Sequence, residues 1–217
     1  MSSTTVSRPQ RRPRSARAVW IKTLHQWHWI SSALCLVGMI LFSVTGITLN
    51  HAGQIEARPS TFTLDAQLPE ALREALQDEA NAGVTAAPIP EALGDWLRDA
   101  LSLGIGNQPA EWNSGEIYLA LPRPGGDAWL SVDLDSGAVA YERTDRGWIA
   151  YLNDLHKGRN TGVAWSWFID LFAVATLVFC ITGLFLLHLH ARQRRATWPV
   201  VALGVVIPVF LLMFFLH

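Results

Sequence analysis

Phe42-Ser-Val-Thr45-Gly46-Ile-Thr-Leu-Asn-His51 closes a long apolar run, and Phe179-Cys-Ile-Thr182-Gly183-Leu-Phe-Leu-Leu-His188 closes a second one with the same Phe-x-x-Thr-Gly pattern. A Leu-His pair precedes each copy, as Leu24-His25 and Leu155-His156. Two hydrophobic segments therefore each carry a histidine near either end. We interpret the rest of the chain as arranged around this pair of segments.

Three apolar runs are close to the length of about 20 residues that spans a bilayer as a helix. They cover residues 30–49, 164–187 and 199–216 of a chain of 217 residues, of which 50% are hydrophobic. None of the three shows a clean polar face, so each differs from the amphipathic helix of a soluble protein. The sequence therefore predicts a membrane α-helical protein with three transmembrane helices and a small external α+β domain between the first and second.

Basic residues mark the flanks that we expect to stay in the cytoplasm. Residues 1–29 hold six bases and no acid, and the link at 191–198 holds three arginines and no acid. The positive-inside rule then places the N-terminus in the cytoplasm and the C-terminus outside. The first apolar run is too long for a cleaved signal peptide, so we predict an uncleaved signal anchor.

These observations divide the chain into six predicted segments. They are a disordered basic tail (1–18), a first membrane helix (19–51), an external domain (52–163), a second membrane helix (164–190), a basic cytoplasmic turn (191–198) and a third membrane helix (199–217).

The external segment changes from helical to strand-like periodicity along its length. Residues 68–80 and 90–103 predict helices, and a meander of three antiparallel strands is predicted at 116–121, 128–134 and 138–142. The whole segment holds eight basic and seventeen acidic residues, which suits a surface in contact with solvent. The acids are scattered, so the pattern favours solvation over a cation-binding site.

Six of the seven histidines gather at the ends of the predicted membrane helices. Because the first helix runs outward and the second runs back, their histidines are expected to meet at the same depth in two sets. These sets are His25 and His28 with His188 and His190 at the inner side, and His51 with His156 at the outer side. Histidine can hold haem iron axially, so the pattern predicts one or two non-covalent haem b groups or another metal. The alternative is a set of solvated interfacial histidines.

The choice of inner ligand stays open between His25 and His28, whereas His188 is favoured over His190 because it belongs to the repeated phrase. Asp170 falls inside the second helix, where a carboxylate is costly unless it is paired or wet. It is expected to bond a ligating imidazole or to pair with Arg159. The alternative for this residue is an interfacial acid in contact with water.

Three stretches resemble the PepSY-associated transmembrane family. They are Leu24-His25-Gln-Trp27 ahead of Thr45-Gly46, then Trp129-Leu-Ser-Val-Asp-Leu-Asp135-Ser-Gly137, and then Leu155-His156-Lys-Gly158 ahead of Trp167, Asp170 and Thr182-Gly183. The second stretch is similar to the hairpin of a PepSY domain. The resemblance implies a bacterial inner-membrane protein with residues 52–163 in the periplasm. Some members of the family resemble ferric-siderophore reductases that hold b-type haem between membrane histidines.

The resemblance implies an oxidoreductase that passes electrons across the inner membrane to a periplasmic metal complex, a ferric siderophore, in iron uptake. A single PepSY-like unit and three helices suggest a homodimer or a partner membrane protein besides membrane lipid. The alternative function is a non-enzymatic, membrane-anchored PepSY module that binds or regulates a periplasmic protein or protease. Nucleic-acid binding is not expected, because the short basic tail lies at the membrane, where topology explains it.

Overall fold

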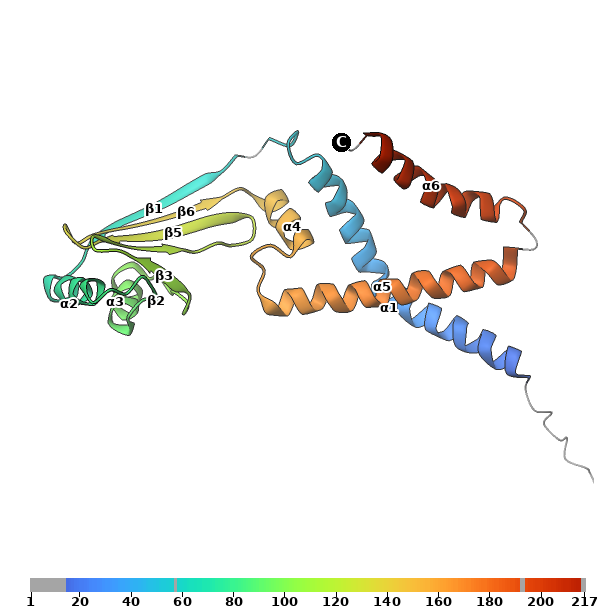
Figure 1. The fold of residues 1–217 in the computed structure, drawn as a ribbon, viewed down its shortest axis with the longest axis horizontal. Coiled ribbons are helices and arrows are strands. Elements are labelled where there is room, and N and C mark those ends of the chain that lie inside the picture. Colours follow the sequence, from blue (N-terminus) through green and yellow to red (C-terminus); the bar gives the residue numbers. More distant parts are fainter. Residues whose placement is uncertain (1–14, 57, 192–193, 216–217) are drawn as a thin grey trace, which may run out of the picture. The chain divides into compact units, whose positions relative to one another are not determined.

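The structure is a computed structural model that describes residues 15–56, 58–191 and 194–215 (Figure 1). The chain forms two compact units. The helical unit comprises Met1–Ile40 and Ile169–His217, and the sheet unit comprises Leu41–Phe168.

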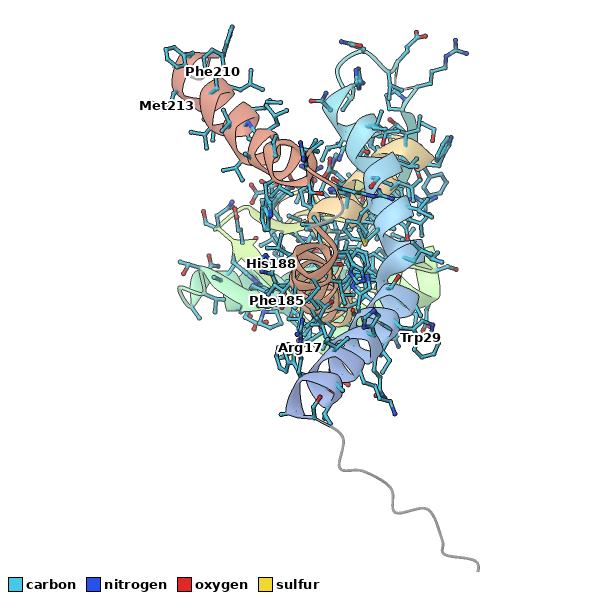
Figure 2. All side chains as sticks on the ribbon, turned by 90° about the vertical axis from the view of Figure 1, so that its right-hand side faces the viewer. Arg17, Trp29, Phe185, His188, Phe210 and Met213 are labelled. Atoms are coloured by element: carbon cyan, nitrogen blue, oxygen red, sulfur yellow. The ribbon has the colours of Figure 1, made fainter. Side chains whose placement is uncertain are left out.

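Among the described residues, three helices are long and apolar enough to cross a membrane, which confirms the prediction of three such helices. They are α1 (Ala16–Asn50), α5 (Val163–His190) and α6 (Thr197–Phe215). α1 begins three residues before its predicted start, so part of the predicted disordered tail is helical; residues 1–14 of that tail lie outside the described residues. α6 is apolar on every side and contains Pro208, and Figure 2 shows Phe210 and Met213 projecting from it. A helix that is hydrophobic all round suits lipid surroundings.

Within the helical unit, α1 and α5 pack as an antiparallel pair. A Cβ on Gly38 would collide with the ring of Phe172, so glycine is needed where the helices approach. Further along, His28 of α1 contacts Thr182 of α5. The residue numbers of the contacting positions rise on one helix and fall on the other, which is the antiparallel arrangement that the sequence predicted. The contacting stripe of α1 repeats at three and four residues, as in a coiled coil. It comprises Leu24, His28, Ser31, Cys35 and Gly38.

The sheet unit contains a six-stranded antiparallel sheet in the order β1-β6-β5-β4-β3-β2. The strands are β1 (Ser60–Gln67), β2 (Ala86–Pro88), β3 (Pro109–Trp112), β4 (Glu116–Ala120), β5 (Gly126–Asp133) and β6 (Ala138–Asp145). Helices α2 (Glu70–Asn81) and α3 (Glu91–Leu101) cover one face of the sheet (Figure 1). Leu76, Leu93 and Leu97 of these helices are buried there against alternate residues of the central strands, such as Leu119 and Leu130.

The predicted three-stranded meander is incomplete. It corresponds to β4, β5 and β6, and the sequence interpretation missed β1, β2 and β3. β2 and β3 are three and four residues long, begin or end in proline, and depend on pairing with each other. A separate helix, α4 (Trp148–Lys157), also precedes α5, and Gly158 ends it in the left-handed conformation with φ 68°.

A side-chain turn fixes the register between β5 and β6. Asp133 Oδ1 accepts hydrogen bonds from the backbone N–H and the hydroxyl of Ser136, at 2.7 and 2.8 Å. These bonds favour the ionised carboxylate and hold the pKa of Asp133 below its ordinary value. Gly137 follows with φ 73°, a conformation that glycine adopts without strain.

The core under α3 provides a test of the sheet unit. Leu97 is fully buried, so Leu97→Ala should lower the free energy of unfolding of this unit by about 2–5 kcal/mol through lost burial and a cavity. Asp99→Ala on the exposed face of the same helix should change it by less than about 0.5 kcal/mol. Pulse proteolysis of the full-length protein in urea measures both values, and equal effects would contradict this core.

Candidate functional site

The second copy of the repeated phrase surrounds the imidazole of His28. We name the group formed by His28, Phe179, Thr182 and Gly183 the His28 site. The ring of His28 stacks on Phe179 with centroids 4.8 Å apart, and its Nδ1 lies 3.0 Å from Thr182 Oγ1. A Cβ on Gly183 would lie only 3.2 Å from His28 Cε1, so the missing side chain makes room for the ring.

The first copy of the phrase surrounds His156 in the same way. We name the group formed by His156, Phe42, Thr45 and Gly46 the His156 site. The ring of His156, on α4, lies 4.9 Å from that of Phe42, and its Nδ1 lies 2.7 Å from Thr45 Oγ1. A Cβ on Gly46 would lie 3.6 Å from His156 Cε1, which is an ordinary contact distance. The glycines of the phrase thus lie against imidazole rings.

The threonine bonds predict which ring nitrogen carries the proton. Thr182 Oγ1 lies 2.7 Å from the carbonyl oxygen of Val178, and Thr45 Oγ1 lies 2.9 Å from that of Leu41. A hydroxyl that donates to such a carbonyl has no second hydrogen and can only accept from the imidazole. We therefore predict an Nδ1–H donor in both histidines, which leaves the lone pair on Nε2.

Polar side chains of α4 place His156 beside Thr45. Thr48 Oγ1 donates to Asn153 Oδ1 at 2.8 Å. Asp154 is buried, and its carboxylate accepts from the Gly125 N–H at 2.8 Å and from Arg159 Nε at 3.0 Å. α4 is thereby attached to the end of α1 and to the turn before β5. Sequence reasoning missed Asn153 and Asp154. Two polar residues directly before Leu155-His156 could have indicated that this segment is held by polar contacts.

The inner set of histidines is brought together through His25 and His190. Their ring centroids lie 6.4 Å apart with an interplanar angle of 88°. Nδ1 of His25 donates to the Ile21 carbonyl at 2.9 Å, and Nδ1 of His190 donates to the Leu186 carbonyl at 2.8 Å. Both rings are therefore oriented by their own helix, and Nε2 is the available atom of each.

The favoured His188 lies elsewhere: its ring is 5.7 Å from that of Trp198 on α6. Figure 2 shows it on the same side of α5 as Phe185. Residues 188 and 190 differ by about 200° around a helix, so only one of them can face His25.

The remaining predicted residues have other surroundings. His51 donates through Nδ1 to the Ile47 carbonyl at 2.9 Å, and in the described part of the chain it makes no ring contact with His156. Arg159, a predicted partner of Asp170, forms its ion pair with Asp154. Asp170 is exposed about two turns into α5. The expectation that Asp170 orients an imidazole stays a prediction.

A pocket of about 400 Å³ opens beside His190. Gly183 and Arg194 are among its lining residues. From the sequence, Arg194 indicated only the cytoplasmic side of the membrane, as one of the three arginines of the 191–198 link. Among the residues that the structure describes, no group of three or more His, Cys, Asp or Glu side chains could hold a metal ion. An iron atom already held by porphyrin nitrogens needs only two protein ligands.

The tautomer of the two phrase histidines can be tested by removing the hydroxyl acceptors. Thr182→Val should release Nδ1 of His28 and give a mixture of tautomers, while His156 keeps its Nδ1–H form. Thr45→Val should do the reverse, so each variant controls for the other. Nitrogen-15 NMR of histidine-labelled protein distinguishes the tautomers. An unchanged His28 signal in Thr182→Val would contradict the assignment.

The two glycines differ in the room they leave. Gly183→Ala should displace His28, because a methyl group at 3.2 Å is closer than an ordinary contact, and should lower the thermal midpoint by a few degrees. Gly46→Ala at 3.6 Å should leave the midpoint within about one degree, since the contact is ordinary. Thermal unfolding of the two full-length variants measures the difference. A larger loss in Gly46→Ala would overturn the assignment of roles.

Comparison with known proteins gives one family. The family model described as "Putative PepSY_TM-like" matches residues 19–217. A search of curated proteins finds no match. A search of solved structures likewise finds none. Because the family match covers nearly the whole chain and includes all three apolar helices, the chain belongs to the PepSY_TM-like family of membrane proteins.

Proposed function

We propose that this membrane protein binds haem b between His25 and His190 and passes electrons across the membrane to a metal complex outside. The observation that carries the proposal is the distance of 6.4 Å between the two ring centroids. Two imidazoles on opposite sides of one metal ion have ring centres about 6 Å apart, because the metal–nitrogen distance is about 2.0–2.1 Å. The separation found here suits one iron atom between two ring nitrogens.

The hydrogen bonds of the two rings support the same assignment. Histidines that bind metals commonly donate their other N–H to a carboxylate or a backbone carbonyl, which fixes the tautomer and the ring direction. His25 and His190 make such bonds to Ile21 and Leu186. Nε2 is therefore the nitrogen of each ring that stays available to a metal.

The pocket beside His190 supports a cofactor that carries carboxylates. Arg194 contributes a guanidinium to its wall. Guanidinium groups pair well with carboxylates, and haem carries two of them as propionates. Haem, when bound, supplies a one-electron redox centre.

The residues of the chain would then have separate roles. His25 and His190 would bind the iron, and their helix carbonyls would orient the rings. The His28 site, one turn from His25 on α1, would hold α1 and α5 at the spacing that brings His25 to His190. A second haem at His51 and His156 stays a prediction. The ferric-siderophore acceptor, the periplasmic position of residues 52–163 and the bacterial inner membrane rest on the family resemblance.

Single histidine variants test the haem site. His25→Ala and His190→Ala should each lose haem, whereas His188→Ala, on the same helix, should keep it. The measurement is the absorption spectrum of the detergent-purified protein, oxidised and then reduced with dithionite, with a haem assay for stoichiometry. Loss of haem in His188→Ala with retention in His190→Ala would restore the ligand that the sequence favoured. A wild-type protein that stays colourless when cells are supplied with haem precursor would refute the proposal.

A further inference from the structure

The two edges of the sheet differ in their protection against pairing with another strand. The β2 edge is three residues long and ends in Pro88. The β1 edge is eight residues long, contains no proline, lysine or arginine, and pairs with β6 without a break from Ser60 to Gln67. Native proteins usually protect edge strands by proline, by lysine, by bulges or by shortness, and an unprotected edge is a template for strand addition.

The ladder between β1 and β6 identifies the backbone groups that are free at this edge. The Leu68 N–H donates to the Gly137 carbonyl at 2.8 Å, which continues the ladder by one position. Residues two apart in an antiparallel strand bond to the same neighbour, so the even-numbered residues of β1 bond to β6. The odd-numbered residues therefore direct N–H and C=O groups outward. They are Thr61, Thr63, Asp65 and Gln67, and all four are exposed.

The two sides of the edge have different chemistry. On the side that α2 and α3 cover, Phe62 is 48% exposed, and the Arg143 guanidinium lies 5.6 Å from its ring centre. On the open side, the register places Glu142 opposite Thr63. In the six described strands, six acids and no base lie on this open side. The acids are Asp65, Glu111, Glu116, Asp127, Asp133 and Glu142. One of them, Asp127, pairs with Arg146 from the loop after β6.

We propose that the β1 edge binds an extended segment of another protein in which basic residues alternate with apolar ones. Backbone hydrogen bonds to the free groups of β1 would supply affinity, and alternate side chains would supply specificity. Basic side chains would lie beside Asp65 and Glu142, and apolar ones would pack on Phe62 and Leu64. A second copy of this chain also offers a suitable alternation in β1. Residues 52–163 hold seventeen acids and eight bases in each copy, however, so these segments of two copies would repel each other. The surface does not depend on haem.

The test uses the full-length protein in detergent and a fluorescent eight-residue peptide that alternates lysine and valine. Anisotropy should show binding, and Thr63→Pro should weaken it at least about tenfold by removing an outward N–H. The Thr63 N–H does not serve the β6 ladder, so Thr63→Pro should keep the fold, which circular dichroism checks. Thr63→Val is the matched control and should bind like the wild type.

Charge provides a second variant that does not change the backbone. Asp65→Lys should weaken the binding of the lysine–valine peptide and strengthen the binding of a glutamate–valine peptide of the same length. Equal binding of the lysine–valine peptide to wild type, Thr63→Pro and Asp65→Lys would overturn the proposal in favour of nonspecific attraction. A wild-type dimer that Thr63→Pro dissociates would replace the basic segment with a second copy as the occupant.

Discussion

A hydrogen bond between an imidazole Nδ1 and a threonine hydroxyl, made once in each unit, fixes the arrangement around the histidines. In apolar surroundings an unpaired N–H costs free energy, so the bond strongly favours one register of the packed helices. Each residue of the Phe-x-x-Thr-Gly phrase has a separate task in it. The phenylalanine packs on the ring, the threonine hydroxyl forms a hydrogen bond with Nδ1 of the ring, and the glycine leaves room for the ring.

The two phrases are reciprocal. α1 carries His28, which binds to the second copy, and it also carries the first copy, which receives His156. Each half of the chain thus holds the histidine of the other half.

Local sequence patterns predicted the helices and strands that local forces stabilise. Unbroken hydrophobicity located α1, α5 and α6, and alternation located β4, β5 and β6. The sequence patterns did not predict β2 and β3, because these strands are very short and are stabilised by non-local pairing. The histidines were found by position along each helix, but their partners depend on helix rotation, which the sequence leaves open. His188 therefore lies by Trp198 while His190 lies by His25. The spacing of Phe, Thr and Gly on one helical face was visible in the sequence. It indicated helix packing, but it did not show that the group packed there is an imidazole.

The hydrogen bonds of the two phrase histidines use only one nitrogen of each ring. Nδ1 of His28 and of His156 lies against a threonine hydroxyl, which ties the ring to the neighbouring helix. Nε2 takes no part in that bond, because an imidazole has two separate ring nitrogens. A ligand or a water molecule can therefore come and go at Nε2 while the Nδ1 contact and the helix packing stay in place.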